Sequence, residues 1–367
     1  MKKIYIILGI VALVLIAGGV FIAQRMNIAP PEPAVRTLNE PVIIERTSAR
    51  DSLAVIRNTG YKFYQMGNNG SIGAEVGIKH GYLNVASNNG QMAFYAIGDS
   101  DTMIVAERWM PAEEAHNIRD IGGLFTKDGY QLKWGKVFRA DELASLNKED
   151  FKLLAPLQIQ TIIDFRTSAE IEEKPDTWPD LASIDHVELS IMTDTIADKS
   201  EWLEKLKSDN FNGDSLLYMA NRGFVEEFSD KYKQFFEMLL GGEMEYPVMY
   251  HCTGGKDRTG FATFLILLAL GVDEQTAIDE YLMTNYYTHG KNEDMLKMAA
   301  AFYGIDPVKL RSLAGVKKEF IQGALDAISD HYGTVDNFLC EALNVCEAEK
   351  EQLKTMLLYG YETAQVD

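Results

Sequence analysis

Ten consecutive residues in the second half of the chain combine a thiol, a guanidinium group and three glycines at a spacing suited to phosphoryl chemistry. They read His251-Cys252-Thr253-Gly254-Gly255-Lys256-Asp257-Arg258-Thr259-Gly260. A short apolar segment typical of a strand precedes them, and a strongly apolar segment typical of a helix follows. A strand that turns sharply into a helix directs successive backbone N–H groups at one point, where the helix N-terminus adds roughly half a positive charge. We therefore predict that this loop binds a phosphate dianion.

Each type of side chain in the loop suggests a role. Cys252 is predicted to be the nucleophile, because a positive field favours the reactive thiolate. Arg258 is predicted to grip two phosphate oxygens, a bidentate contact that lysine cannot make. His251 is predicted to order the loop backbone from behind. The residues predicted to bind the phosphate are Thr253, Gly254, Gly255, Lys256, Arg258 and Thr259.

Other anion-binding and metal-binding sites fit the sequence less well. A nucleotide-binding P-loop needs Ser or Thr after its lysine, whereas Lys256 is followed by Asp257. The remaining histidines are scattered, with no Cys or His partner at the spacing of a zinc site, so we predict no metal and no cofactor. The net charge of −19 argues against nucleic acid and anionic lipid as general partners. A local positive pocket remains compatible with a phosphorylated substrate.

The chain resembles the family of bacterial tyrosine and lipid phosphatases that includes mycobacterial protein tyrosine phosphatase B. The resemblance covers about residues 111–367 and rests on the loop 255–260, on 117–123 (Asn-Ile-Arg-Asp-Ile-Gly-Gly), on 137–140, on 164–166 and on 281–285. It implies hydrolysis of phosphotyrosine without a metal, with phosphoserine, phosphothreonine or phosphoinositide as further substrates. The preference among these stays open, and so does a non-catalytic module that only binds a phosphorylated ligand.

The resemblance also suggests a general acid. The loop aspartate is implicated in catalysis in this family, so Asp257 is assigned as the acid for the leaving oxygen. The alternative acid is Asp164, at the end of its strand, where pairing with Arg166 is the simpler role. Lys256 either faces the phosphate or is a solvated lysine. Arg119 and Asp120 are predicted to support the loop.

The surrounding sequence predicts an α/β fold. A phosphatase domain over 111–367, with a central, mostly parallel sheet flanked by helices, is expected to follow a small antiparallel β module over 42–110. Within the module, a hairpin is predicted around Asn88-Asn89-Gly90. In the phosphatase domain, helices are predicted over 141–154, 224–240 and 259–270, with strands over 161–165 and 247–250. Helical stretches between 200 and 240 are either a lid or ordinary packing helices.

The first 41 residues indicate export. An uncharged apolar run over 4–23 follows two lysines and is long enough to cross a bilayer as a helix. Residues 1–26 are therefore predicted to be a membrane anchor or a cleaved signal peptide, and 27–41 a proline-containing linker. Either form places the phosphatase domain in the periplasm or outside the cell. Cys340 and Cys346 are expected to be unpaired unless a turn separates them.

Overall fold

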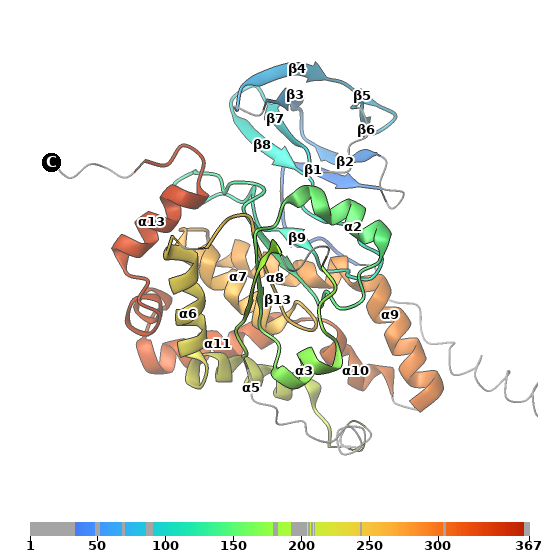
Figure 1. Cartoon of the computed structure of the whole chain (residues 1–367), viewed down its shortest axis with the longest axis vertical. Coiled ribbons are helices and arrows are strands. Elements are labelled where there is room, and N and C mark those ends of the chain that lie inside the picture. Colours follow the sequence, from blue (N-terminus) through green and yellow to red (C-terminus); the bar gives the residue numbers. More distant parts are fainter. Residues whose placement is uncertain are drawn as a thin grey trace, which may run out of the picture.

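The computed structural model describes residues 34–362 except 48–51, 68–69, 86–90, 179–182, 192–203, 205, 207, 209, 243 and 304–305 (Figure 1). The predicted anchor or signal segment, residues 1–26, lies outside the described residues. Within the described part of the chain, no helix is both long enough and apolar enough to cross a membrane.

The central sheet of the phosphatase domain has five strands in the order β12-β11-β13-β10-β9. Strands β10 (Val137–Ala140), β11 (Thr161–Asp164), β12 (Asp185–Glu188) and β13 (Val248–His251) are parallel. The short edge strand β9 (Arg119–Asp120) is antiparallel to β10. The predicted α/β fold with a mostly parallel sheet is confirmed. The carboxyl ends of its parallel strands meet at one edge, which is where open α/β sheets bind their ligands.

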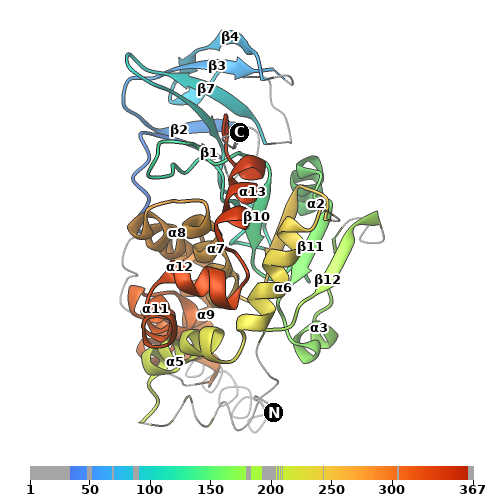
Figure 2. The ribbon, with the colours of Figure 1, turned by 90° about the vertical axis from the view of Figure 1, so that its left-hand side faces the viewer.

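Helices cover both faces of this sheet (Figures 1 and 2). In β13 the side chains of Val248 and Tyr250 belong to the large core built with α7, whereas Met249 lies in a smaller core with residues of α2. This alternation follows from the two-residue period of a strand. The helices are α2 (Lys148–Leu154), α3 (Ser168–Glu173), α5 (Gly213–Glu226), α6 (Ser229–Leu240), α7 (Asp257–Ala269), α8 (Glu274–Tyr287), α9 (His289–Met298), α10 (Pro307–Ala314), α11 (Lys318–Tyr332), α12 (Val335–Asn337) and α13 (Glu347–Leu357). Shorter turns are η1 (Ala155–Leu157), η3 (Ala299–Tyr303) and η4 (Phe338–Ala342).

The predicted antiparallel β module is also present. It contains two four-stranded sheets, in the orders β1-β2-β6-β5 and β4-β3-β7-β8, with Phe63 and Phe94 buried in their shared core. Its strands are β1 (Val42–Arg46), β2 (Leu53–Asn58), β3 (Lys62–Met66), β4 (Ile72–Val76), β5 (Ile78–Lys79), β6 (Tyr82–Leu83), β7 (Ala93–Ile97) and β8 (Thr102–Ala106).

The predicted turn Asn88-Asn89-Gly90 lies outside the described residues, but the prediction that the strands on either side of it form a hairpin is wrong. The strands on either side of it, β6 and β7, lie in different sheets: β6 pairs with β2 and β5, and β7 pairs with β3 and β8. The turn residues favoured a tight reversal locally. Burial of Leu83 and Phe94 within the same core, from two different sheets, decided the pairing instead.

The β module packs directly on the phosphatase domain. The amide of Gln131 accepts from the backbone N–H of Ile104 at 2.9 Å and donates to its carbonyl at 2.7 Å, which mimics a strand pair. The indole N–H of Trp134 donates to the same carbonyl at 2.8 Å, and the guanidinium of Arg108 lies over the indole ring. These contacts join the last strand of the module to the segment between β9 and β10.

Two predicted helices begin or break at unexpected positions. The stretch 141–154 is helical only in α2, because Asn147 caps that helix by accepting from the backbone N–H groups of Glu149 and Asp150. The stretch 224–240 is divided between α5 and α6, with Phe228 non-helical between them. The interruption gives the two helices different directions against the core.

Cys340 and Cys346 form a disulfide, so the expectation of two unpaired thiols is wrong. Their Cα atoms lie 4.2 Å apart. The chain turns between them, with Asn344 in the left-handed region at φ 57°, and α13 begins after Cys346. The two residues therefore do not share one continuous helix, on which they would have pointed in different directions.

Candidate active site

The predicted phosphate loop connects β13 to the N-terminus of α7 at the carboxyl edge of the parallel sheet. Cys252 follows the last residue of β13, is unpaired and is 2% exposed. The α7 helix behind it is apolar nearly all round and buried, so the core fixes its position. The loop thus stands on two rigid elements that the sequence had predicted.

Three successive carbonyl groups of the loop are held from outside. The carbonyl of Thr253 accepts from the backbone N–H of Glu142 at 3.1 Å. The side-chain amide of Asn117 donates to the carbonyls of Gly254 and Gly255, at 3.2 and 2.9 Å. Since the C=O and N–H of a peptide plane point to opposite sides, the N–H groups of the three following residues point into the loop. A phosphate dianion needs this array of donors.

Gly255 is required by this geometry. Its φ is +60°, and a Cβ there would lie 2.4 Å from the carbonyl oxygen of Ala140. A non-glycine residue would meet both the strain of a left-handed conformation and a clash with rigid backbone of the neighbouring strand. Gly254 has a negative φ and faces only the flexible side chain of Lys256.

Buried charges support the loop from behind. Arg139 donates to the carbonyl of Gly255 at 2.6 Å and to Glu280 at 2.7 Å, and Arg119 bonds the other oxygen of Glu280 at 2.6 Å. Burial raises the pKa of the Glu280 carboxyl, but Arg119 and Arg139 outweigh it and hold the pKa below its usual value. Burial and the neighbouring Arg139 lower the pKa of Arg119 to about 10. Arg119 also hydrogen-bonds Asn117 and thereby reaches the loop indirectly.

Asp120 lies on the other side of β9 and contacts the β module. Its carboxylate accepts from the side-chain amide of Gln91 at 2.8 Å and from the backbone N–H groups of Gly122 and Gly135, at 2.7 and 2.6 Å. Burial raises the pKa of Asp120, and this effect outweighs the hydrogen bonds, which lower the pKa. The two neighbouring residues 119 and 120 therefore face different structures, the loop and the domain junction.

Arg258 is held by a carboxylate that the sequence analysis did not single out. Glu170, on α3, accepts from Nη1 at 2.8 Å and from Nη2 at 2.9 Å, and it also accepts from the hydroxyl of Thr253. Burial raises the pKa of Glu170, but the contacts with Arg258 outweigh it and lower the pKa to about 2. Glu170 is therefore ionised at neutral pH and fixes the guanidinium beside the loop.

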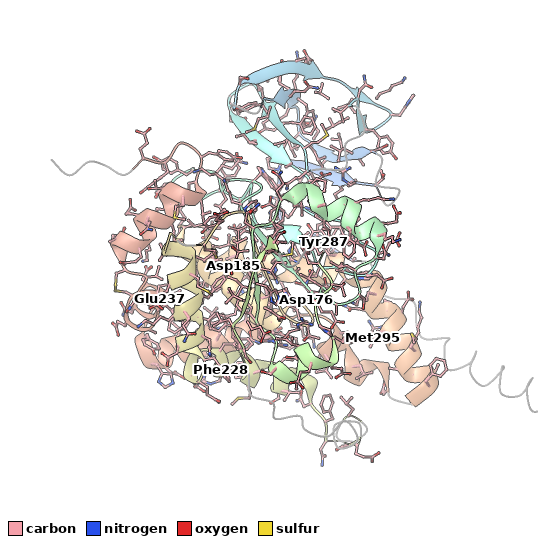
Figure 3. All side chains as sticks on the ribbon, viewed as in Figure 1. Asp176, Asp185, Phe228, Glu237, Tyr287 and Met295 are labelled. Carbon is pink, nitrogen blue, oxygen red and sulfur yellow. A yellow bond between two sulfur atoms is a disulfide. The ribbon has the colours of Figure 1, made fainter. Side chains whose placement is uncertain are left out.

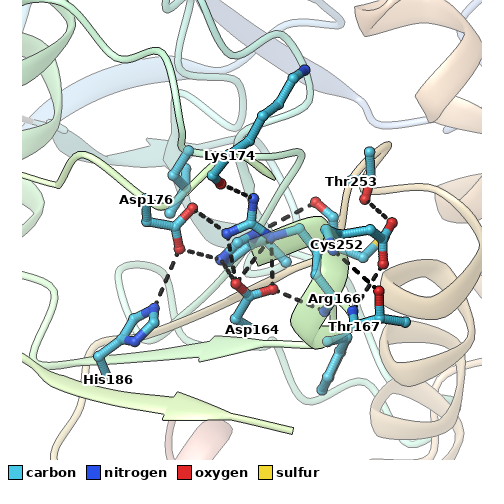
Figure 4. A network of polar contacts seen from close by, with 12 residues as sticks. Asp164, Arg166, Thr167, Lys174, Asp176, His186, Cys252 and Thr253 are labelled. Carbon is cyan, nitrogen blue, oxygen red and sulfur yellow. Dashed lines mark hydrogen bonds and ion pairs between the residues drawn. The ribbon is translucent and has the colours of Figure 1, made fainter. Parts of the chain in front are cut away.

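A second buried network joins Arg166 to Asp164 and Asp176, and Asp176 to His186 (Figure 4). The Nε2 atom of His251 is 3.0 Å from Asp176, which also bonds Arg166 at 2.7 Å. Asp164 is fully buried and bound by Arg166 through both Nε and Nη2. Burial raises the pKa of Asp176, but hydrogen bonds from His186 and His251, with Arg166, hold it well below its usual value. This network fixes the imidazole of His251, the residue before the predicted nucleophile Cys252.

The same network brings one potential metal-ligand atom from each of Asp164, Asp176, His186 and His251 within 4.8 Å of one another. The guanidinium of Arg166 already bonds both carboxylates at 2.7 Å. A divalent ion would have to share this space with a fixed positive charge, which opposes its binding. The residues present do not fit a metal centre.

Asp257 and Lys256 have different surroundings. Asp257 is the first residue of α7, with a side chain 16% exposed, 3.4 Å from both the ammonium of Lys256 and the hydroxyl of Tyr281. Lys256 donates to the carbonyl of Gly315 at 2.9 Å and is 13% exposed, so it is not a freely solvated lysine. The hydroxyl of Thr259, which is predicted to bind the phosphate, is buried without a hydrogen-bond partner in the described part of the chain.

Helices α5 and α6 are packing helices in this structure. Phe224 of α5 and Tyr232 and Phe235 of α6 are fully buried in the large core. Tyr232 also donates from its hydroxyl to the carbonyl of Arg258 at 3.2 Å. This burial favours the packing role over the lid for α5 and α6, while residues 192–203 lie outside the described part.

Five residues that support the site had no role predicted from the sequence: Asn117, Arg139, Glu170, Asp176 and Glu280. Glu170 had a detectable signal, because Thr167 and Glu170 form a capping box at the start of α3, only a few residues after Asp164-Phe165-Arg166. Glu280 immediately precedes 281–285, one of the segments on which the family resemblance rests, but nothing in the sequence indicated that Glu280 is buried. Asn117 and Arg139 lie in segments that carry the resemblance, but nothing indicated their role, and Asp176 carried no signal.

Comparison with known proteins places this site in a family. Residues 110–359 match the model of the tyrosine phosphatase family, and the chain belongs to that family. The triple specificity protein phosphatase PtpB of Mycobacterium tuberculosis is 27% identical over 285 residues, covering 69% of this chain and 100% of PtpB. A tyrosine-protein phosphatase of Nostoc commune is 27% identical over 223 residues, covering 60% of this chain and 73% of that protein.

The resemblance predicted from the loop is therefore confirmed, and the family implies phosphatase activity. Among solved structures, that of TpbA from P. aeruginosa matches with 18% identity over 47% of this chain and 90% of the other. Its TM-score of 0.26 is too low to support a structural argument.

Proposed function

We propose that the chain is a cysteine-dependent protein-tyrosine phosphatase. The thiolate of Cys252 attacks the phosphorus of a phosphotyrosine, the P–O bond to the phenol breaks, and Asp257 gives its proton to the leaving oxygen. Water then cleaves the S–P bond and releases inorganic phosphate. The observation that carries the proposal is the position of Cys252 at a loop whose carbonyls are bound from outside and whose N–H groups point inward.

The same loop serves the phosphoinositide alternative equally well. One observation favours protein phosphotyrosine: the ammonium of Lys256 is engaged by the carbonyl of Gly315 and by Asp257. A second phosphate group would have to compete with those contacts, and the net charge of −19 opposes a polyanionic substrate.

We further propose that the enzyme is exported and remains anchored through residues 1–26. The apolar run over 4–23 supports this, and so does the disulfide between Cys340 and Cys346, because disulfides persist in oxidising compartments. An alkaline phosphatase fused after residue 33 is expected to be active, and a reporter that folds only in the cytoplasm is expected to stay dark. The reverse result contradicts export.

Phosphate release from a panel of phosphopeptides and phosphoinositides tests the activity. We expect the full chain to hydrolyse phosphotyrosine peptides, with the activity unchanged by EDTA. Cys252→Ser should abolish turnover but still bind a phosphate analogue, since the loop donors remain. After rapid quenching of the wild type, the phosphoryl group should be found on the peptide that contains Cys252.

Loss of activity in EDTA, or a Cys252→Ser variant that retains more than a few per cent of the rate, contradicts the covalent mechanism. Preferential hydrolysis of phosphoinositides would assign the same chemistry to the other substrate class. Binding of phosphopeptides without any turnover would leave a phospho-ligand-binding module.

A further inference from the structure

Helix α9 and the π-helical turn η3 that follows it carry apolar side chains on their outer surface. Met295, Met298 and Phe302 are 44%, 56% and 68% exposed. Their spacing of three and four residues places them on one face of a helix, and Met295 is labelled in Figure 3. Large side chains that form an exposed apolar stripe mark an interaction surface more often than single exposed residues do.

The opposite face of the same helix is already buried. Leu296 of α9 is 2% exposed and packs with Leu310 of α10 in a small core of its own. The stripe is therefore not the side by which α9 joins the fold. The helix is apolar both toward the protein and toward the outside, and its outer face has no partner in the described part of the chain.

The described chain begins beside this helix. Ala34, Val35 and Thr37 line a cavity of about 330 Å³ together with residues of α9, among them His289 and Leu296. The hydroxyl of Thr37 donates to the backbone carbonyl of Asp279 in α8, which fixes this start, and Val35 is 67% exposed. The segment that leads to the N-terminus thus leaves the phosphatase domain beside α9, on the side of Leu296.

The remaining length of chain keeps the stripe close to any membrane that holds the N-terminus. The apolar run ends at Ala23, and residues 24–33 separate it from Ala34. Ten residues extend at most about 35 Å, and less when relaxed. Helix α9 is itself about 15 Å long. An anchored chain would therefore keep α9, and the stripe it carries, near the bilayer at a high local concentration.

The charges near the stripe indicate what kind of surface it meets. Lys291 is bound to Asp141 at 3.1 Å, and Lys297 lies 3.5 Å from Asp294, so these lysines do not form a free basic patch. The chain as a whole carries a net charge of −19. Anionic headgroups would be repelled, whereas a zwitterionic headgroup region offers apolar burial without that cost.

We propose that Met295, Met298 and Phe302 insert into the zwitterionic lipid surface of the membrane that holds residues 1–26. This inference rests on the anchored form of the proposed function and adds a second, peripheral contact with the same bilayer. It fixes the side of the phosphatase domain that faces the lipid, because α9 and the start of the described chain lie together there.

Fluorescence quenching by lipid tests the contact in the full chain. Met298→Trp and Phe302→Trp are each reconstituted in phosphatidylcholine vesicles with brominated acyl chains, and the signal of the four native tryptophans is subtracted with the wild type. The matched control is Ile72→Trp on β4, an exposed aliphatic position at 56%, at the far end of the molecule from α9 (Figures 1 and 2). Insertion to the headgroup–acyl boundary should quench both added tryptophans on the stripe at least about twofold more than the control.

Equal quenching at the stripe and at position 72 overturns the proposal, and so does a chain that does not float with the vesicles. Cross-linking between two copies through the stripe, without quenching by lipid, assigns the surface to a dimer instead. Turnover of an aryl phosphate is measured on the same vesicles. If the expected quenching is seen without turnover, the phosphatase assignment fails and the membrane contact stands. If turnover is seen without the expected quenching, the membrane contact fails and the phosphatase assignment stands.

Discussion

Glu170 holds the guanidinium of Arg258 through two parallel hydrogen bonds, from Nη1 at 2.8 Å and from Nη2 at 2.9 Å. Nη1 also bonds the carbonyl of Phe165 at 3.2 Å, at the end of the neighbouring strand. The arginine is therefore oriented before any phosphate arrives. Such preorganisation lowers the entropic cost of binding a substrate in the reactive geometry.

We expect Glu170→Gln to lower kcat/KM for an aryl phosphate about tenfold, because the loss of one charge-assisted contact of about 1.5 kcal/mol loosens the arginine. Steady-state kinetics of the purified variant measure the effect. The matched control is Glu172→Gln, an exposed glutamate on the same helix, which should leave the rate unchanged. Equal effects of the two substitutions would mean that helix α3 as a whole, rather than the contact between Glu170 and Arg258, determines the rate.

The same pair makes stability depend on pH. The pKa of Glu170 is lowered to about 2 in the folded chain, since the contacts with Arg258 outweigh the effect of burial. A lowered pKa contributes stability that is complete above the ordinary pKa of about 4.5 and is lost as the pH falls toward 2. In urea unfolding between pH 3 and pH 6, the difference in unfolding free energy between wild type and Glu170→Gln should shrink toward the acid end. A difference that is constant across this pH range contradicts an ion pair between an ionised Glu170 and Arg258.

Gly255→Ala and Gly254→Ala form a matched pair that tests the shape of the loop. At position 255 the added methyl meets the carbonyl oxygen of Ala140 at 2.4 Å with φ at +60°, so the loop must move and kcat/KM should fall at least about a hundredfold. At position 254 the nearest atom is the flexible Cγ of Lys256 at 3.3 Å, and the loss should stay within about tenfold. Kinetics with one activated substrate compare them. A larger loss for Gly254→Ala would mean that the loop is built differently.

Much of the fold could be predicted from local sequence patterns. The two wrong predictions, of a hairpin and of unpaired cysteines, concern features that these local patterns do not determine. The strand before Cys252 and the helix after it could be predicted because apolar periodicity and the glycine after the helix act within a few residues. The hairpin at 88–90 could not, since burial of Leu83 and Phe94 from two sheets depends on residues far away in the chain. The disulfide depended on a turn at Asn344 that helical periodicity does not reveal.

In the site, the residues in the loop itself were predictable, and those that hold it were not. Asn117, Arg139 and Glu280 lie more than a hundred residues from the loop, or on a helix after it, and meet only when the sheet forms. A sequence motif records which side chains act, whereas the partners of a buried charge depend on the packing of whole elements.

The disulfide should contribute to the stability of the fold but not to the rate of catalysis. Replacing Cys340 and Cys346 together by serine opens a loop of seven residues, and loop-closure entropy predicts a loss of about 2 kcal/mol in the free energy of unfolding. Turnover should be retained, because both cysteines lie after α11, outside the residues that hold the loop. Urea unfolding and aryl phosphate kinetics check the two halves of this statement. A large loss of activity at unchanged stability would show that the C-terminal segment acts on the site.

Substitutions of Asp257 and Asp164 distinguish the two candidates for the general acid. The phenol of tyrosine, with a pKa of about 10, is a poor leaving group unless an acid supplies a proton, and such help is typically worth about 10²–10⁴-fold. Asp257 is partly exposed at the start of α7, whereas Asp164 is fully buried and bound by Arg166. Asp257→Asn should therefore slow hydrolysis of phosphotyrosine strongly and that of a nitrophenyl phosphate much less.

Asp164→Asn is the control, and it should lower stability by about 3–5 kcal/mol because it leaves the buried charge of Arg166 partly uncompensated. Its effect on the rates should be similar for good and poor leaving groups. The measurement is kcat/KM across a series of aryl phosphates, plotted against the pKa of the leaving phenol for both variants. A steeper dependence in Asp164→Asn would place the acid at the end of β11 and contradict our assignment. If neither variant steepens it, the proton comes from a residue outside this pair.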